Sequence, residues 1–232
     1  MTSPSNQHKE NRMSSSNKQL TPGPAVFRKR FYTLPRLLAD VRVLLSRRAD
    51  ARAIFGEQRL DPQLCEEVML AVSTANACAF CTYIHQETAL AAGTGIRELA
   101  EFAGMDPDTI DEDHAIAVMW AQSRAEAGLG TAGEHLERTL ATRFTDQQRR
   151  DLDTVIRTTT LSNLAGNTLE ALIRRRQGRK VPGSRLFDEL IIGSAYILGS
   201  IAPGLRTARM RGKSVCQAAR EATTAIRMSA AA

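Results

Sequence analysis

Three side chains of this sequence have the types and the spacing that redox chemistry at sulfur requires. Cys78 and Cys81 are separated by two residues, and His85 follows the second cysteine by four. A Cys-x-x-Cys pair can change between a dithiol and a disulfide, and a neighbouring imidazole can accept the proton that leaves before a thiolate attacks. On one helix these positions are i, i+3 and i+7 and share a face. The motif therefore predicts thiol–disulfide chemistry.

The segments that must hold these residues are predicted to be helices. Asp61-Pro62 is typical of a helix start, and a second helix is expected from Cys78 to Ala92, ending at Gly93. Apolar residues at helical spacing also follow Pro35. Further helices are expected at 96–102, at 115–127, and from a capping box at Thr145 to about Arg176. No segment alternates strictly with a period of two, so we predict an all-α fold.

Residues 66–85 resemble the alkylhydroperoxidase D-like branch of the carboxymuconolactone decarboxylase superfamily. That branch has a glutamate twelve residues before Cys-x-x-Cys-x-x-x-His, which corresponds here to Glu66, Cys78, Cys81 and His85. Asn76 also fits the pattern. The resemblance is specific over about 60–93, is limited to the helical pattern over about 111–200, and does not include 1–30. Some members have a histidine between the cysteines, where this chain has Ala-Phe.

The resemblance implies a compact multi-helix enzyme that reduces hydroperoxides without a cofactor or metal and assembles into a homo-oligomer. It implies a dithiol electron donor, of the lipoyl type. Cys81 is expected to attack because His85 is one turn away, Cys78 to resolve, and Glu66 to orient His85. The order of the cysteines stays open, because the dipole at the helix start favours a thiolate at Cys78.

Two other kinds of function compete with this interpretation. Cys78, Cys81, His85 and Glu66 could bind zinc, although a second Cys-x-x-Cys or His pair is missing. The chain could also be a decarboxylase or a non-catalytic helical assembly module, as in the branch that lacks the cysteine pair. If the helix phase differs, Glu67 replaces Glu66 as the partner of His85.

The remaining candidate residues have structural interpretations. Cys65 and Cys216 are expected to be small buried hydrophobic residues without a redox role. His114 and His135 have no partner motif and are expected at the surface or as satisfied core residues. Four polar residues on one predicted helix face are expected to bond to neighbouring helices rather than to line a pocket: Thr159, Thr160, Asn163 and Asn167.

The net charge of +6 is concentrated in one part of the 232-residue chain. Residues 1–60 hold 12 Lys and Arg against 4 Asp and Glu, and the remaining residues hold 19 against 21. The first part of this basic arm has almost no aromatic residue that could stack on a base. We therefore expect solvated charges and no nucleic-acid partner.

Composition predicts three segments: a disordered polar tail at 1–24, an all-α domain at 25–205, and a helical extension or tail at 206–232. The polar start lacks the apolar core of a signal peptide, and four cysteines suit a reducing compartment, so a cytoplasmic location is expected. The apolar stretch 190–202 is shorter than a membrane span and interrupted by Gly and Ser. It is expected to be a buried helix, with no membrane partner.

Overall fold

The computed structural model describes residues 29–91 and 111–231, and within them it contains nine helices and no strand. The predicted all-α fold is therefore confirmed at this level. The helices, in chain order, are α1 (Leu34–Ser46), α2 (Arg48–Phe55), α3 (Pro62–Ala75), α4 (Ala79–Ala91), α6 (Glu112–Glu126), α7 (Glu134–Arg143), α8 (Asp146–Arg176), α9 (Leu186–Met210) and α10 (Val215–Ala231).

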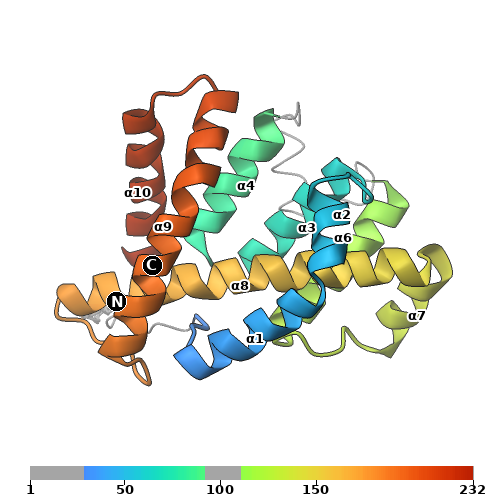
Figure 1. Cartoon of the computed structure of the whole chain (residues 1–232), viewed down its shortest axis with the longest axis horizontal. Helices are drawn as coiled ribbons and strands as arrows, with labels where there is room; N and C mark the ends of the chain where they lie inside the picture. Colours follow the sequence, from blue (N-terminus) through green and yellow to red (C-terminus); the bar gives the residue numbers. More distant parts are fainter. Residues whose placement is uncertain (1–28, 92–110, 232) are drawn as a thin grey trace, which may run out of the picture.

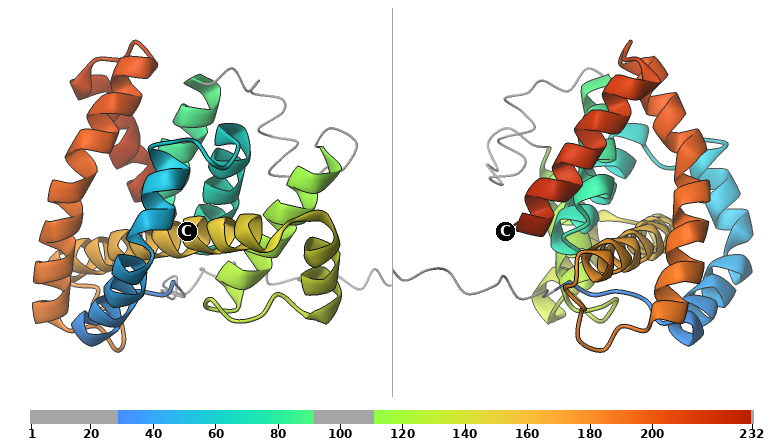
Figure 2. Two further views of the ribbon diagram at one scale, coloured as in Figure 1. Left: turned by 45° about the vertical axis from the view of Figure 1, so that its right-hand side comes forward. Right: turned by 90° about the vertical axis from the view of Figure 1, so that its left-hand side faces the viewer.

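The long helix α8 is the element on which the others are assembled. It runs along the molecule, and α9 and α3 cross it at different points (Figures 1 and 2). The larger hydrophobic core lies between α3, α6 and α8, where Val72, Ala117 and Ile156 are fully buried. A smaller core joins α8 to α9 through Leu164 and Ile192. The helices α4, α9 and α10 lie side by side at one end of the molecule.

Helix starts follow the predicted signals closely. The Asp61 carboxylate accepts a hydrogen bond from the Leu64 amide at the start of α3, and α8 begins with the predicted capping box of Thr145 and Gln148. Two helices were not predicted: α2, which is separated from α1 only by a break at Arg47, and α7. The predicted helix at 96–102 and the predicted stop at Gly93 lie outside the described residues.

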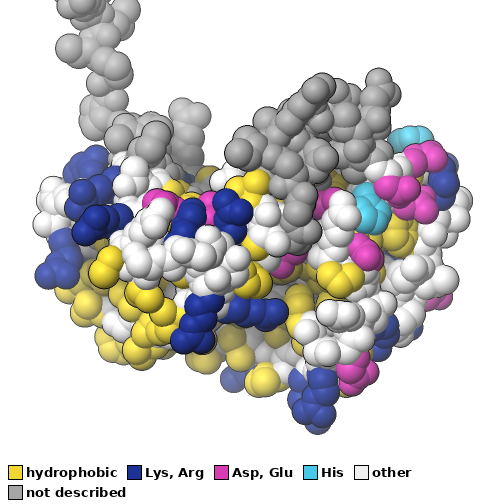
Figure 3. All heavy atoms as spheres, turned by 90° about the horizontal axis from the view of Figure 1, so that it is seen from above, with side chains coloured by type: hydrophobic (Ala, Val, Ile, Leu, Met, Phe, Trp, Pro, Cys, Tyr) yellow, Lys and Arg dark blue, Asp and Glu magenta, His cyan; other side chains and the backbone are white. Residues whose placement is uncertain are grey.

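Residues 190–202 are helical, as predicted, but the prediction that this helix is buried is wrong. These residues belong to α9, which buries Ile192 and Gly193 against α8 but leaves other large side chains exposed: Leu190, Ile191, Ile197, Leu198 and Ile201. Hydrophobic side chains gather at the end of the molecule where α9 lies (Figure 3). In the described part of the chain, α9 alone is long and apolar enough to cross a membrane, a test that core helices of soluble proteins also pass.

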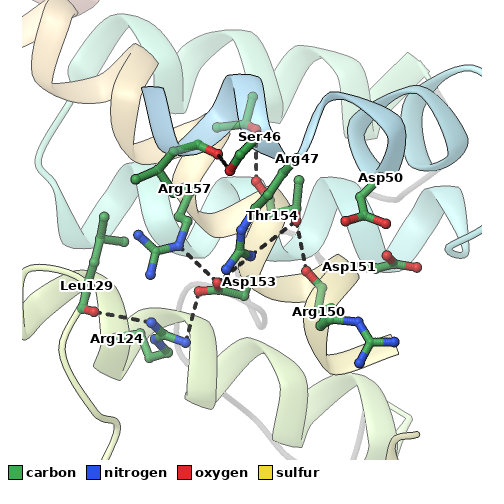
Figure 4. Close-up of polar contacts among 12 residues, drawn as sticks. Ser46, Arg47, Asp50, Arg124, Leu129, Arg150, Asp151, Asp153, Thr154 and Arg157 are labelled. Atoms are coloured by element: carbon green, nitrogen blue, oxygen red, sulfur yellow. Dashed lines mark hydrogen bonds and ion pairs between the residues drawn. The ribbon is translucent and has the colours of Figure 1, made fainter. Parts of the chain in front are cut away.

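A buried carboxylate on α8 connects three parts of the fold (Figure 4). Asp153 pairs with Arg47 at the end of α1, with Arg124 of α6 and with Arg157 one turn further along α8, at 2.6, 2.9 and 2.9 Å. A charge buried in this way is costly to leave without its partners. The cluster therefore keeps α1 and α6 in position on α8, away from the cysteines.

Candidate active site

The joint between α3 and α4 places the first cysteine at a helix start. Asn76 ends α3, and Ala77 has a left-handed conformation with φ of 53°. The Ala77 amide donates to the Thr74 carbonyl and the Cys78 amide to the Ser73 carbonyl, which is the Schellman pattern of helix ends. This tight turn leaves Cys78 as the residue directly before α4.

Cys78 and Cys81 form a disulfide, and their Cα atoms are 5.3 Å apart. The Cys81 amide also donates a hydrogen bond to Cys78 Sγ, with 3.4 Å between nitrogen and sulfur, so Cys78 caps the first turn of α4. Both cysteines are almost completely buried, at 2% and 5% exposed. The motif thus has the paired sulfurs that thiol–disulfide chemistry needs, at the positive end of a helix dipole.

The other two cysteines are free and differ from each other. Cys65 is buried in α3, as predicted, and burial raises the pKa of its thiol to about 12, with smaller contributions from Glu66 and other nearby carboxylates. It is therefore an unreactive thiol at neutral pH. The prediction that Cys216 is buried is wrong, because this residue lies exposed on α10.

His85 is paired with Glu66, the residue that the sequence analysis favoured over Glu67. His85 Nδ1 lies 3.0 Å from Glu66 Oε2, and the two side chains are 18% and 24% exposed. This contact joins α4, the helix that carries Cys81 and His85, to Glu66 on α3. A carboxylate in contact with one ring nitrogen orients an imidazole and leaves its other nitrogen available for a proton.

A second Glu–His pair stands directly beside the first and was not predicted. Glu67 Oε2 lies 2.8 Å from Nδ1 of His114 on α6. This contact raises the pKa of His114 above its ordinary value, an effect that partial burial opposes. The consecutive glutamates of α3 thus each have a different histidine. His135 is exposed on α7, as one of the two predicted alternatives stated.

Two residues of the C-terminal helices approach the disulfide, and no sequence motif pointed to them. The Tyr196 hydroxyl of α9 lies 3.2 Å from Cys81 Sγ, and its ring packs edge-on against Phe80 at 6.0 Å between centroids. Gly166 of α8 leaves space for the Cys78 sulfur and the Tyr196 hydroxyl. A Cβ at this position would lie 2.9 Å from Cys78 Sγ and 3.0 Å from Tyr196 Oη. Burial raises the pKa of Tyr196 to about 12.

A largely apolar cavity of about 360 Å³ opens beside Cys78. It lies between the start of α4 and the helices α8, α9 and α10, and Cys78 is the only one of the four predicted site residues that lines it. Its walls include Phe80, Ile197, Ile201 and Ala222, and its few polar groups include Asn167. The site therefore has two sides: an apolar space at Cys78, and the His85–Glu66 pair outside that space.

Three of the four polar residues on this face of α8 form the predicted bonds to α3 and the turn after it, whereas the Thr159 hydroxyl donates to the Val155 carbonyl within α8 itself. Ser73 donates to Asn163 Oδ1 at 3.2 Å, and Asn76 donates to Thr160 at 3.4 Å. Asn167 Nδ2 donates to the Asn76 carbonyl at 2.9 Å and also lines the cavity. The conformation of the turn before Cys78 is thus held from α8, which explains why these polar residues are buried.

In the described ranges, no three His, Cys, Asp or Glu side chains converge in a way that could hold a metal ion. The residues of the zinc alternative form two separate pairs, because the cysteines bond to each other and His85 bonds to Glu66.

No curated protein and no solved structure matches the chain. Residues 44–109 match the model of the carboxymuconolactone decarboxylase family, and this range contains Glu66, both motif cysteines and His85. This match covers less than a third of the chain and is consistent with the superfamily that the motif indicated.

Proposed function

We propose that this protein is a thiol-dependent peroxidase of the alkylhydroperoxidase D-like branch, which reduces hydroperoxides with the Cys78–Cys81 pair. The observation that supports this most strongly is a disulfide at the start of a helix with one sulfur bordering an apolar cavity. A decarboxylase of this superfamily has no need for a pair of cysteines at this position, whereas a peroxidase needs one sulfur to be oxidised and a second to close the disulfide.

In the proposed reaction, a thiolate of the pair attacks the hydroperoxide and becomes a sulfenic acid. The other thiolate then displaces the hydroxyl group and forms the disulfide, and a dithiol donor restores the two thiols. His85 accepts a thiol proton, and Glu66 orients the imidazole through their 3.0 Å contact. No cofactor or metal takes part in this scheme.

The cavity favours hydroperoxides that carry an apolar group. Its volume of about 360 Å³ and its aliphatic and aromatic walls suit a hydroperoxide with an organic substituent better than hydrogen peroxide. The lipoyl-type donor, the cytoplasmic location, the homo-oligomer and the absence of nucleic-acid and membrane partners remain predictions from the sequence, as does the division at residues 24 and 205.

The experiment that tests this function measures consumption of cumene hydroperoxide by the reduced protein with dihydrolipoamide as the donor. We expect dithiol-dependent turnover by the unaltered chain and its complete loss in both Cys78→Ser and Cys81→Ser. Cys65→Ser serves as the control, because its buried thiol takes no part and its turnover should be retained. Decarboxylation of carboxymuconolactone, with no peroxide consumption, would instead support the other branch of the superfamily.

A further inference from the structure

The two sulfurs of the disulfide have different surroundings. Cys78 lines the apolar cavity, whereas Cys81 does not. Cys81 Sγ is instead in contact with the hydroxyl of Tyr196, at 3.2 Å. A reagent that enters the cavity therefore meets Cys78 first, and the sulfur behind it is the one with a hydroxyl group beside it.

Tyr196 is the donor in this contact, because a disulfide sulfur carries no proton. The ring packs edge-on against Phe80, and its hydroxyl end lies close to Gly166, so the hydroxyl has a defined position. The group also stays protonated throughout the pH range in which thiols ionise, since burial keeps its pKa high. It can thus donate to whatever charge develops on Cys81.

We propose that Tyr196 is a catalytic residue that donates a hydrogen bond to the Cys81 thiolate, and that Cys78 is the sulfur that reacts with the hydroperoxide and with the dithiol donor. The order in which the cysteines react rests on the proposed peroxidase function. The role of Tyr196 requires only that the disulfide is reduced and formed again. This order is the reverse of the one favoured from the sequence, where only His85 decided between the two sulfurs.

In the proposed oxidative steps, Cys78 reacts first and Cys81 forms the disulfide. The Cys78 thiolate attacks the terminal oxygen of an organic hydroperoxide, the O–O bond breaks, and the alkoxide takes up a proton and leaves as an alcohol. His85 removes the proton of Cys81, which lies one turn before it on α4. The Cys81 thiolate then attacks the sulfenic sulfur of Cys78, the S–S bond forms, and hydroxide leaves as water after taking up a proton.

The reductive steps use the same geometry in the other direction. A donor thiolate attacks Cys78 from the cavity, the S–S bond breaks, and Cys81 leaves as a thiolate that accepts the Tyr196 hydrogen bond. The second donor thiol attacks the donor sulfur of the mixed disulfide and releases the Cys78 thiolate. The amide of Cys81 already points at this sulfur, which stabilises the charge released there.

The first experiment measures the redox equilibrium of Cys78 and Cys81 against glutathione buffers, without peroxide. In Tyr196→Phe the ring remains and the donor is lost, so the reduced form loses a charge-assisted hydrogen bond. We expect the equilibrium to move roughly tenfold or more toward the disulfide, which is about 30 mV or more toward negative potential. Tyr83→Phe is the matched control: it lies on α4, bonds to Glu221 and does not contact either sulfur.

If the redox potential of the disulfide in Tyr196→Phe equals that in Tyr83→Phe, the proposed catalytic role of Tyr196 is wrong. Phe fills the same space as the Tyr196 ring, so a change in packing alone should not shift the redox potential. The thermal stabilities of Tyr196→Phe and Tyr83→Phe are measured alongside, so that the two potentials are compared between equally stable variants.

The second experiment determines the order of the cysteines by trapping sulfenic acid with dimedone after one equivalent of cumene hydroperoxide. We expect a dimedone adduct on Cys78 in Cys81→Ser, and at least tenfold less adduct on Cys81 in Cys78→Ser. An adduct mainly on Cys81 overturns the order while leaving the peroxidase function intact. Absence of adduct in both variants overturns the order together with the peroxidase function, whereas the Tyr196 shift is measured independently of both.

Discussion

The α3–α4 pair and the C-terminal helices α8–α10 contribute different things to the same disulfide. The first region carries the cysteines and the His85–Glu66 pair, all within the part of the chain that matches the family. The second provides Gly166, Tyr196 and most of the cavity walls, and lies outside the matched range. Proton transfer and substrate binding are therefore assigned to separate parts of the molecule.

This separation has a consequence for variants. Substitutions on α3 and α4 should change how readily the thiols ionise, with the same effect on every substrate. Substitutions of the cavity walls on α8–α10 should change which substrates react, whereas Tyr196 on α9 acts on the Cys81 sulfur itself. The following variants test that contrast, beginning with the largest expected effect.

The strongest effect on the α3–α4 side is expected from losing the imidazole of the pair. His85→Ala should slow alkylation of the reduced motif cysteines at pH 7 by roughly 10–100-fold, since general-base assistance is lost, and Glu66→Gln should act in the same direction. Iodoacetamide kinetics measure this effect.

The neighbouring pair provides the matched control. His114→Ala and Glu67→Gln remove the same chemical groups from an adjacent position on α3 and from α6, and they should leave the alkylation rate within about twofold. Equal losses in both pairs would mean that the histidines act on the packing of α3 and not on the thiols.

On the side of the C-terminal helices, Ala222→Phe should fill part of the cavity. We expect kcat/KM for cumene hydroperoxide to fall about tenfold, while the value for hydrogen peroxide stays nearly unchanged, because only the larger substrate needs the space. Thr224→Phe on the same helix is the control, since this exposed residue does not line the cavity. A parallel loss with both peroxides would contradict the assignment of the cavity to the organic group.

The His114–Glu67 pair predicts a pH dependence of stability that is independent of the redox site. The pKa of His114 is raised in the folded protein, so folding favours its protonated form. This stabilisation is fully present below pH 6.5, the unfolded value, and is lost as the pH rises through the folded pKa. Urea unfolding of His114→Asn should therefore show a larger deficit at pH 5.5 than at pH 8.5. The opposite trend would contradict the pairing.

The smallest effect is expected at the turn before Cys78. Ala77 has a φ of 53°, which glycine adopts without steric cost, so Ala77→Gly should raise the free energy of unfolding by up to about 1 kcal/mol. Thermal unfolding of the oxidised protein measures this change. A decrease in stability would show that the left-handed turn is not strained.

Local signals predicted the helices and the motif well. Asp61, Pro62 and the Thr145 capping box define helix starts within a few residues, so α3 and α8 were predictable. The pairing of His85 with Glu66 followed from spacing and family resemblance, although both glutamates are adjacent. The break between α1 and α2 was missed because no Gly or Pro marks Arg47.

The other half of the site could not be predicted because it depends on contacts between distant residues. Gly166 is helical and has no turn motif, and only its distance to Cys78 shows why a side chain would not fit. Tyr196 lies in an apolar stretch that was interpreted as a buried helix, so a hydroxyl beside Cys81 had no signal. That stretch was expected to be buried because it is apolar and too short to span a membrane, and the expectation was wrong because much of α9 is exposed.

The central claim is tested most directly by counting thiols in the reduced protein before and after one equivalent of cumene hydroperoxide. The chain has four cysteines. We predict that four thiols are titrated before the addition and two after it, and that peptide mapping places the new disulfide between Cys78 and Cys81, with Cys65 and Cys216 still reduced. Four thiols remaining after the addition would contradict the account.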